Sequence, residues 1–595
     1  MVLKVKEVVS SHLLKRGKEK RKIVMNEDKA LTGYPSIDRP WLKYYSEDVI
    51  NKKIPKCSIY QNIYDSNEKY LMHTALIFLG RKITYKALFR NIDKVAKALT
   101  AYGVKYGDNV AICMPATPEA VYIVLGLNKI GANANMLNPT FNEEQLIDRV
   151  KETKAELMIV VNELYTRIQS VVPKTDIKTV VACSAVNSLG AIVKCVKKIR
   201  QIPGTVSWNE FIKKGKRQVI SIPKYVPNHP AIMVYSSGTT GASKGIQLTN
   251  DSVNALLIQG GHIGFDWKRE NRFFCQIPIW FSTGICATVF LPLVTGITVI
   301  LEPLYDFELF YKHIVKYKPN FMITAVGLVD YLKERKEFSK AYRNFKYLVI
   351  GGEYVVPTAE KKFNKWLEDN QAPERLHKGY GMCECGSIIT ATHYVCNVIG
   401  SAGVPLPHVI VAAFDLQTGK ELKYGERGEI RVLTPCKMSG YYNNEAATEK
   451  YFYEDEEGRV WACTGDMGYI TEDGSLFVDG RISSSYEDEM GNTIYLFDVE
   501  RAVLSVEQVR QCKVVVSKID KKTEHVVHMV LDKGADVGST IESVKKQCTR
   551  VLKPESVPKW VKIYDMALPV APSGKLDVNV MEMDINNLIS LQDRK

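Results

Sequence analysis

The sequence predicts an α/β protein built from more than one domain. A chain of 595 residues exceeds what a single hydrophobic core usually serves. Short apolar runs of strand length alternate with longer segments in which apolar residues recur at helical spacing, which is the pattern of strands layered with helices. With 46% hydrophobic and 25% charged residues, the composition is that of an ordinary globular protein.

The first such alternation lies within residues 75–130. Ala75–Tyr85 is typical of a hairpin with its turn at Gly80-Arg-Lys, and Thr84 can cap the helix that follows. The apolar stripe of that helix consists of Leu88, Ile92, Val95 and Leu99. A strand within 107–115 and a helix over Pro118–Ile130 come next, so we expect helices layered on a sheet here.

The longest weakly polar stretch, Ile285–Leu301, does not have the form of a membrane span. It is shorter than the roughly 20 apolar residues that a bilayer requires, and Pro292 and Gly296 interrupt it. We interpret it as a buried helix, a turn and a strand, and we expect no transmembrane segment.

The stretch Tyr235-Ser-Ser-Gly-Thr-Thr-Gly-Ala-Ser-Lys-Gly245 predicts a phosphate site. It joins two apolar runs of strand length, 231–235 and 245–248. Its glycines let the backbone turn tightly and bring amide groups to a phosphate, its hydroxyls add donors, and Lys244 adds a positive charge. The other residues expected to contact the phosphates are Ser236, Ser237, Gly238, Thr239, Thr240 and Gly241.

Two other interpretations fit part of this pattern. A P-loop requires a glycine directly before the lysine, a Ser or Thr directly after it and then a helix, and the stretch has none of these. A glycine- and serine-rich surface turn is the usual meaning of such composition. However, a run of this length with glycines, hydroxyls and lysine in this order is much more specific.

The loop closely resembles the signature of the adenylate-forming superfamily, which includes acyl-CoA synthetases, aryl-CoA ligases, peptide-synthetase adenylation domains and firefly-type luciferases. Other segments resemble further motifs in the family's order. The resemblance implies a large N-terminal domain of layered sheets and helices, a smaller mobile α+β C-terminal domain and an active site between them. We place a basic arm at residues 1–45, the adenylate-forming domain at 46–480 and a C-terminal lid domain at 481–595.

Tyr347–Glu353 resembles the family's adenine-contacting turn. It is a strand that ends in glycines, and such an end leaves room for a flat ligand at the carboxyl edge of a sheet. The resemblance assigns Gly352 and Glu353 to the nucleotide.

Gly379–Gly386 resembles the family's "YGMTE" motif. There Tyr380 would stack near adenine, and Glu384 would hold Mg²⁺ near the phosphates. Cys383 replaces the family's threonine, which removes a hydroxyl donor to the α-phosphate. The residues that complete this part of the nucleotide site are Gly381, Met382 and Cys383.

Two later motifs carry the ribose-binding and catalytic positions. Thr-Gly-Asp alone is a common turn, but in this order Asp466 is by position the family's ribose-binding aspartate, because a carboxylate can accept both ribose hydroxyls. Arg481 adds an arginine for the nucleotide and marks the start of the C-terminal domain. Near the end, 568–576 resembles "P-x-x-x-SGK", which makes Lys575 the catalytic lysine by position.

Pro278–Gly284 resembles the family's acyl-pocket segment, with Phe281 at the place of its aromatic residue. A bulky ring there can shield a forming anhydride from water, and the alternative is that Trp280 and Phe281 are core residues. Gly352 is expected to border the same pocket. Peptide-synthetase domains usually carry an aspartate hereabouts for a substrate ammonium; its absence favours an acid without an amino group.

The resemblance therefore implies an AMP-forming acid–thiol ligase. ATP would convert a fatty or aryl acid to an acyl-adenylate; Mg²⁺ on Glu384, Lys244 and the loop amides would hold the pyrophosphate, and Lys575 would bridge the carboxylate and the α-phosphate. A thiol, most often coenzyme A, then displaces AMP after the C-terminal domain rotates. The alternatives are an acyl-AMP ligase that loads an acyl carrier protein or another acceptor, and a nucleotide-binding interaction protein without chemistry.

The formal net charge is +14, and its densest part is residues 1–30, with nine Lys or Arg against four Asp or Glu. Such an arm can weakly contact an anionic membrane surface, or it can be a solvated terminus. We expect no nucleic-acid partner. Without a signal-peptide core after the arm, and with thirteen cysteines that show no paired metal spacing, we expect a cytoplasmic protein with free thiols.

The clearest departure from the family follows Arg481. Relatives usually carry a hinge lysine or aspartate and then a basic or neutral loop that lines the thiol's approach. Here the hinge place falls on Ser483, and the loop carries Glu487, Asp488 and Glu489. These carboxylates should repel the phosphates of coenzyme A and slow or alter the thiol step. The alternative is a solvated insertion that swings clear.

Overall fold

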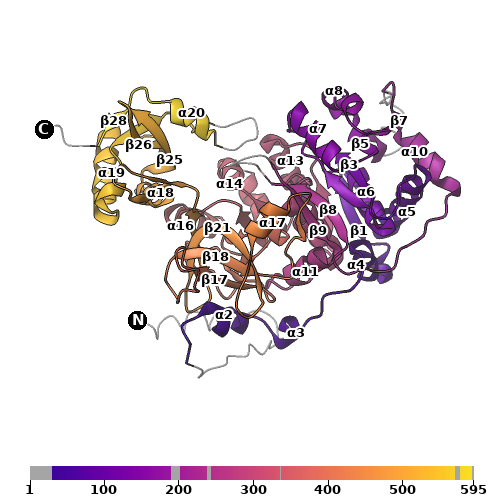
Figure 1. Ribbon diagram of the computed structural model, residues 1–595, viewed down its shortest axis with the longest axis horizontal. Coiled ribbons are helices and arrows are strands. Elements are labelled where there is room, and N and C mark those ends of the chain that lie inside the picture. The colour runs from indigo at the N-terminus through magenta and orange to yellow at the C-terminus, as the bar shows by residue number, and fades with distance from the viewer. Residues whose placement is uncertain (1–29, 189–201, 237–242, 336, 570–575, 592–595) are drawn as a thin grey trace.

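The computed structural model describes residues 30–188, 202–236, 243–335, 337–569 and 576–591. Figure 1 shows a large body and a smaller lobe, coloured yellow, that the C-terminal part of the chain forms. The basic segment 15–22 lies outside the described residues. In the part of the chain that is described, no helix combines the length and the apolar character that crossing a membrane requires.

Two large sheets with mainly parallel centres make the body. The first, here the β8 sheet, runs in the order β19 (Gly440–Tyr441), β9 (Gly245–Thr249), β8 (Pro230–Tyr235), β4 (Asn133–Met136), β3 (Asn109–Cys113), β5 (Leu157–Val161), β6 (Thr179–Cys183) and β7 (Val206–Ser207). The second, here the β13 sheet, runs in the order β16 (Val404–Pro405), β15 (Thr390–Ala391), β14 (His377–Tyr380), β13 (Tyr347–Gly351), β12 (Phe321–Thr324), β10 (Arg272–Cys275), β11 (Thr298–Leu301), β1 (Thr74–Phe78) and β2 (Arg81–Thr84).

The main hydrophobic core lies between these two sheets. It combines strand residues of both with the helices α5 (Tyr85–Ala101), α6 (Pro118–Ile130) and α11 (Asn250–Gly260). All residues of α6 are buried, and at Gly126 a side chain would press on Val95 of α5, at 3.1 Å from its Cγ1. Close approach of α5 and α6 therefore needs a glycine at this point.

Further helices cover the outer faces of both sheets. Alternate residues of each strand face opposite sides, so that Val110 and Ile112 of β3 join the central core while Ala111 and Cys113 join an outer one. The outer helices are α7 (Glu143–Glu152) and α8 (Tyr165–Ile168) on the β8 sheet, and α13 (Phe307–Tyr317), α14 (Val326–Lys333), α15 (Phe338–Tyr342) and α16 (Pro357–Asp369) on the β13 sheet. The predicted layering of helices and sheets is thus confirmed.

Local expectations hold where the sequence signals were strong. The hairpin β1–β2 is present, but it turns through Leu79 and Gly80, which both have positive φ, and Arg81 and Lys82, expected in the turn, pair with β1. Thr84 caps α5 by accepting a hydrogen bond from the Ala87 amide at 3.3 Å. The apolar stretch near residue 290 forms a π-helix, Thr283–Phe290, then α12, Leu291–Thr295, a left-handed turn at Gly296, and β11. The predicted helix, turn and strand are therefore present.

A third sheet connects the body to the lobe. It consists of β17 (Ile410–Phe414), β18 (Gly428–Leu433), β21 (Val460–Ile470), β20 (Phe452–Glu454) and β22 (Leu476–Arg481). The N-terminal segment packs beside it: Trp41 is fully buried, and the Ser36 hydroxyl donates to Glu421 at 2.6 Å. The remaining body helices are α2 (Pro35–Asp38), α3 (Glu47–Ile50), α4 (Ile59–Asp65), α10 (Trp208–Lys214) and α17 (Glu445–Tyr451).

The C-terminal lobe begins with a hairpin, β23 (Ser485–Glu487) and β24 (Thr493–Tyr495), where the sequence suggested a loop. Its sheet runs β25 (Val509–Ile519), β26 (Lys522–Leu531), β27 (Trp560–Tyr564) and β28 (Ile589–Ser590), with helices α18 (Leu496–Leu504), α19 (Val537–Val551) and α20 (Val578–Met583). The buried carboxylate of Asp479 on β22 pairs with Arg501 of α18 and with Arg427 of the body.

A buried ion pair fixes β14 against α16. Lys378 Nζ lies 2.6 Å from Glu360 Oε1, and their side chains are only 5% and 1% exposed. Glu360 also accepts a hydrogen bond from the Gly400 amide at 2.8 Å. Because both charges are shielded from water, neither group can lose its partner cheaply.

We predict that Glu360→Ala lowers the free energy of unfolding by about 3 kcal/mol, because it leaves the Lys378 ammonium buried without its carboxylate. The same helix offers a control in Asp369→Ala, which removes an exposed pair with Lys365 and should change stability by less than about 0.5 kcal/mol. Urea denaturation of both variants checks this. Equal losses in the two variants would contradict it.

Candidate active site

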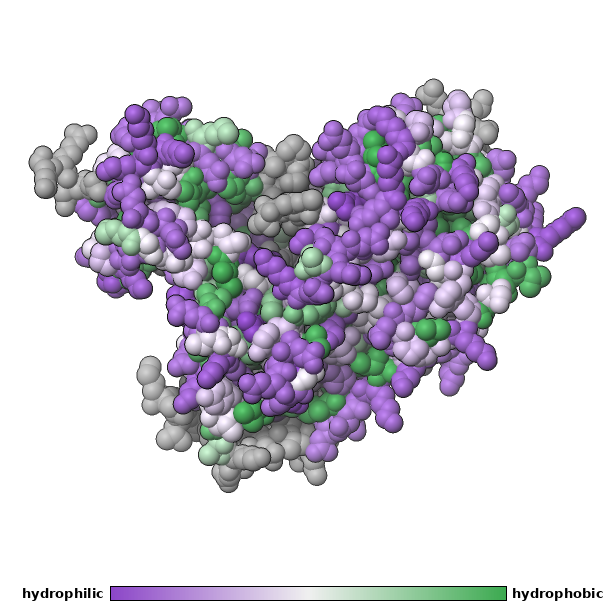
Figure 2. Space-filling model, in the orientation of Figure 1, coloured by the Kyte–Doolittle hydropathy of each residue, from purple (hydrophilic) through white to green (hydrophobic). Residues whose placement is uncertain are grey.

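A cavity of about 1340 Å³ lies where the carboxyl ends of β13 and β14 face the loop between β8 and β9 and the C-terminal lobe. The lobe contributes Lys513–Val516 of β25 and Val578 of α20 to its wall. Figure 2 shows the surface notched between the lobe and the body. Open α/β sheets bind ligands at this edge, so the position agrees with the predicted site.

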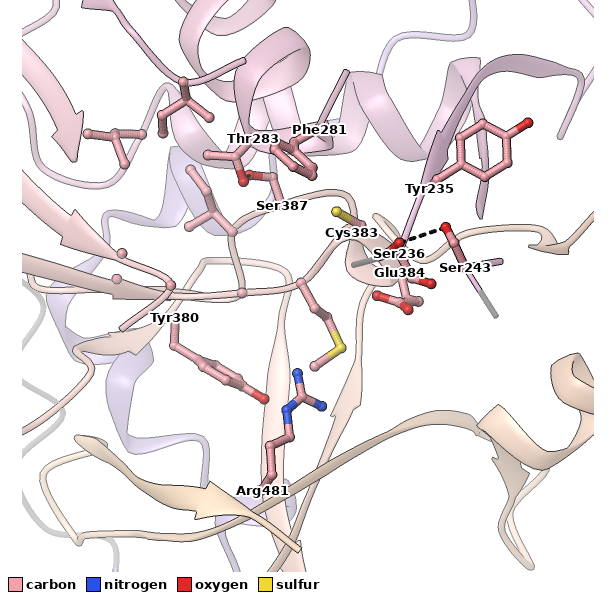
Figure 3. Close-up of a pocket in the computed structure, with 18 of the residues that line it drawn as sticks. Tyr235, Ser236, Ser243, Phe281, Thr283, Tyr380, Cys383, Glu384, Ser387 and Arg481 are labelled. Atoms are coloured by element: carbon pink, nitrogen blue, oxygen red, sulfur yellow. Dashed lines mark hydrogen bonds between the residues drawn. The ribbon is translucent and has the colours of Figure 1, made fainter. Parts of the chain in front are cut away.

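The two ends of the predicted phosphate loop are tied together by hydrogen bonds. The Ser236 amide donates to the Lys244 carbonyl, and the Lys244 amide donates to Ser236 Oγ, both at 3.0 Å. Ser243 Oγ donates to the Ser236 carbonyl at 2.7 Å, the bond drawn in Figure 3. The predicted contacts Ser237, Gly238, Thr239, Thr240 and Gly241 lie outside the described residues.

Tyr441 connects the two charged residues at this end of the cavity. The Lys244 ammonium lies 4.9 Å from the centre of the Tyr441 ring, and the Tyr441 hydroxyl donates to Glu384 Oε1 at 3.0 Å. Burial and the nearby Glu384 carboxylate raise the pKa of Tyr441, so its hydroxyl keeps the proton that it donates. The sequence analysis did not single out Tyr441; pairing of β19 with β9 brings it beside the loop.

The residues around Glu384 fit a magnesium ion that arrives with phosphates. Mg²⁺ typically takes one or two protein carboxylates and completes its shell with water and phosphate oxygens. Glu384 lines the cavity in a short turn, Cys383–Cys385. The hydrogen bond from Tyr441 uses only Oε1 of its carboxylate. Within the described ranges no group of three or more His, Cys, Asp or Glu side chains is placed to hold a metal. A cation here would therefore depend on the ligand's own phosphates.

Asp466, the residue predicted to bind the ribose, is held by an arginine and a tyrosine. It is only 4% exposed and sits directly opposite Arg481 in the pairing of β21 with β22. Arg481 Nε lies 3.0 Å from Asp466 Oδ1, and the Tyr380 hydroxyl donates to Oδ2 at 2.6 Å. Figure 3 shows the Tyr380 and Arg481 side chains pointing toward one another. A carboxylate has about four acceptor positions, so these two contacts leave lone pairs on Asp466 for further donors. Tyr380 and Arg481 line the cavity, whereas Asp466 lies behind them.

Two glycines shape the space beside Tyr380. A side chain at Gly381 would place its Cβ 1.7 Å from the Ser387 carbonyl oxygen, so this turn closes only with glycine. Gly352 has φ +78°, and nothing lies within 4 Å of the position of its Cβ, which leaves the cavity open there for a flat group. Met382 and Cys383 also line the cavity. The Glu353 carboxylate instead accepts a hydrogen bond from the Val326 amide at the start of α14.

The other half of the cavity is apolar. Phe281 lines it, as expected, while Trp280 packs against the central core. Sequence analysis missed a set of aromatic residues that line this half: Phe265, Trp267, Phe273, Phe321 and Tyr347. The predicted catalytic residue Lys575 lies outside the described residues, one residue before Leu576 and close in sequence to the part of α20 that lines the cavity.

The sequence matches one family model and is similar to known acid–CoA ligases. The model of a family described as "AMP-binding enzyme" matches residues 63–442. A long-chain-fatty-acid–CoA ligase of Bacillus subtilis is 26% identical over 90% of this chain and 96% of its own length. The 4-coumarate–CoA ligase 4 of Arabidopsis thaliana is 22% identical over 84% of this chain and 85% of its own length.

Solved structures show the same fold. The anthranilate CoA ligase AuaEII in complex with anthranoyl-AMP superposes with a TM-score of 0.75 at 19% identity, over 87% of this chain and 95% of that one. ATP-bound MatB from Rhodopseudomonas palustris superposes with a TM-score of 0.74 at 20% identity, over 88% and 98%.

The buried carboxylate of Asp466 predicts a pH dependence of AMP binding. Burial raises the pKa of Asp466 above its ordinary 3.8, although Arg481 partly opposes this. Only the ionised form offers charged oxygens to two hydroxyls, so affinity should be full at neutral pH and fall as the pH is lowered into the acid range through the raised pKa. Calorimetric titration with AMP across this range measures the effect.

Asp466→Asn should bind AMP about tenfold more weakly at neutral pH and lose this acidic limb, because a charged hydrogen-bond acceptor is gone. Asp415→Asn, in an exposed turn outside the residues that line the cavity, serves as the matched control. An acidic limb that persists unchanged in Asp466→Asn would show that another group titrates.

Proposed function

The chain belongs to the AMP-binding enzyme family, and from that membership we propose that its cavity activates a carboxylic acid with ATP and passes the acyl group to a thiol, most often coenzyme A. The acid is a fatty or aryl acid without an α-amino group. The product of the first step is an acyl-adenylate. The enzyme is therefore an AMP-forming acid–thiol ligase.

The observation that carries this proposal is the division of one cavity into a polar and an apolar half. The polar half is lined by Glu384 and Lys244, which suit a metal-bound phosphate and a leaving pyrophosphate. Tyr380 and Arg481 also line it, and Asp466, which suits a ribose, is bonded to both of them. The apolar half begins at Phe281, on the other side of the Cys383 turn (Figure 3). A molecule that joins an adenosine phosphate to an apolar acid matches both halves at once.

In the first step, an oxygen of the acid's carboxylate attacks the α-phosphorus of ATP, and the bond to the β-phosphate oxygen breaks, so pyrophosphate leaves. Attack of one anion on another requires cations and oriented donors where charge accumulates. Lys244 and the loop between β8 and β9 would hold the leaving pyrophosphate, and Lys575 would bridge the carboxylate and the α-phosphate. Glu384 would hold Mg²⁺, which when bound supplies further positive charge to the phosphates.

In the second step, the thiol sulfur attacks the acyl carbon, the bond to the AMP oxygen breaks, and the thiol proton is released. Tyr380 and Asp466 would keep AMP oriented during both steps through the ribose. We place this reaction in the cytoplasm, where ATP, coenzyme A and reduced thiols are available.

The substrate lacks an ammonium because the apolar half offers no partner for one. The described residues that line it around Phe281 and Tyr347 carry no carboxylate: they are hydrophobic or aromatic, apart from the hydroxyls of Thr283 and Ser387, which bond to each other. A buried ammonium without a carboxylate partner is costly, which disfavours an α-amino acid.

The acidic hairpin β23–β24 bears on which thiol accepts the acyl group. Glu487 and Glu489 are exposed on it, while Asp488 accepts hydrogen bonds from the Met490 and Asn492 amides at 2.9 and 2.8 Å and so stabilises the turn. Tyr486 shares a hydrogen bond of 2.7 Å with His525, which fixes the hairpin to β26. We propose that this acidic hairpin slows transfer to free coenzyme A. The alternative acceptor is the thiol of a carrier protein or another small nucleophile.

ATP–pyrophosphate exchange tests the proposed function. We expect exchange with fatty or aryl acids and none above background with proteinogenic amino acids. Lys575→Ala should lower the exchange rate by roughly 10²–10³-fold, the scale for losing one preorganised stabiliser, with little change in ATP binding. Exchange driven by amino acids alone, or a Lys575→Ala variant of normal activity, would contradict the substrate and the role of Lys575, respectively.

Single-turnover transfer from preformed acyl-adenylate tests the hairpin. The double variant Glu487→Gln, Glu489→Gln should accelerate transfer to coenzyme A several-fold at low salt while adenylation stays unchanged, because exposed charges act through a screened field. The double variant Glu456→Gln, Glu457→Gln, of exposed residues on a loop outside the cavity lining, controls for net charge. Transfer as fast as adenylation in the wild type, and unaffected by the double variant, would exclude the repulsion.

A further inference from the structure

Two pairs of stacked rings line the apolar half of the cavity. The ring of Phe265 lies on Tyr347, with centroids 4.0 Å apart and planes at 20°. The indole of Trp267 lies parallel to Phe321, with centroids 5.0 Å apart and planes at 2°. At these separations the faces of the rings touch, so no substrate group fits between them. Phe265 and Trp267 therefore occupy space above the sheet into which an acyl chain would otherwise extend.

The floor beneath these rings is closed. Tyr347 of β13, Phe321 of β12 and Phe273 of β10 are neighbours in the sheet register and point to the same face. Only 8%, 1% and 3% of their respective surfaces are exposed. The fully buried Ile297 packs in the same cluster. An acyl chain cannot pass through the sheet here.

The loop that carries Phe265 and Trp267 is braced from behind. Gly264 has φ +86°, and a Cβ there would lie 2.6 Å from His393 Nε2 and 2.7 Å from Tyr394 Cδ1. His393 is itself buried, and its ring centroid lies 5.5 Å from that of Tyr45 and 4.4 Å from that of Tyr394. Because the backbone at Gly264 lies against the side chains of His393 and Tyr394, the loop cannot move away from the sheet without displacing them.

We propose that Phe265 and Trp267 are specificity-determining residues that restrict the acid to a compact aryl or short acyl group and exclude long-chain fatty acids. This inference rests on the proposed function, since it concerns the acid that the same cavity activates. A long-chain acid could place its carboxylate in the polar half only if one of the two rings, Phe265 or Trp267, moved away from its partner on the sheet. A compact acid needs no such displacement, and the aromatic lining offers it ring contacts.

Chain-length profiles of ATP–pyrophosphate exchange test the proposal. For the wild type, kcat/KM with the better of benzoate and cinnamate should exceed that with palmitate by at least about 10²-fold, the scale on which a closed hydrophobic pocket discriminates. Trp267→Ala and Phe265→Ala should each raise kcat/KM for palmitate at least about tenfold and lower it for the aryl acid. Phe265→Leu, a milder change, gives the same direction if an alanine variant folds poorly.

Tyr305→Ala removes an exposed aromatic residue outside the cavity lining and should leave the profile unchanged. Thermal unfolding and AMP affinity verify that each variant retains its fold and its nucleotide site. A wild type that uses palmitate as well as aryl acids, or variants whose chain-length profile matches the wild type, would overturn this inference alone. Absence of exchange with every acid would overturn the proposed function, and this inference with it.

Discussion

One buried carboxylate connects the parts of this molecule that must act together. Asp466 belongs to the third sheet, receives a hydrogen bond from Tyr380 at the end of the β13 sheet, and pairs with Arg481, the last residue before the C-terminal lobe. A desolvated carboxylate is costly unless it is hydrogen-bonded and paired, so these contacts hold one another in place. The polar end of the cavity is thereby built at the junction of the body, the third sheet and the lobe.

The same junction explains how a cavity can combine two kinds of chemistry. Its polar half is made by residues at strand ends and in turns, where backbone groups and charged side chains reach the surface. Its apolar half is made by the inner face of the β13 sheet, whose rings continue directly into a hydrophobic cluster. The charged groups are thus near the surface and the apolar rings are in the core, although the two halves of the cavity are adjacent.

Local signals in the sequence were sufficient for the elements and for several of the residues that line the cavity. Thr84 is a typical helix cap, and two glycines stand at the carboxyl end of β13. Glu384 and Asp466 lie in short motifs that can be recognised without knowledge of distant contacts. Contacts between distant segments were not accessible in this way. Phe265 and Trp267 lie in an irregular loop without periodicity, and their partners Tyr347 and Phe321 look like ordinary strand residues until the sheet register brings them together.

Tyr441 was missed for the same reason, since its relation to Lys244 and Glu384 depends on a strand pairing between segments almost two hundred residues apart. The pairing of Arg481 with Asp466 is a similar case, because both residues were assigned to the nucleotide but not to each other. Departures from a family pattern, as at Cys383 and Ser483, were visible at once, whereas their surroundings were not.

The helix α6 has a consequence for how the chain folds. A helix that is buried on every side has no face that water can stabilise, so it gains its stability only when α4, α5 and β4 have packed against it, in the core between the two sheets. Those sheets include strands from residues near 75 and strands beyond 400, and their assembly therefore requires contacts of large sequence separation. Such contacts are the slow part of folding. We therefore expect the core around α6 to be completed only after the strands beyond residue 400 have been made.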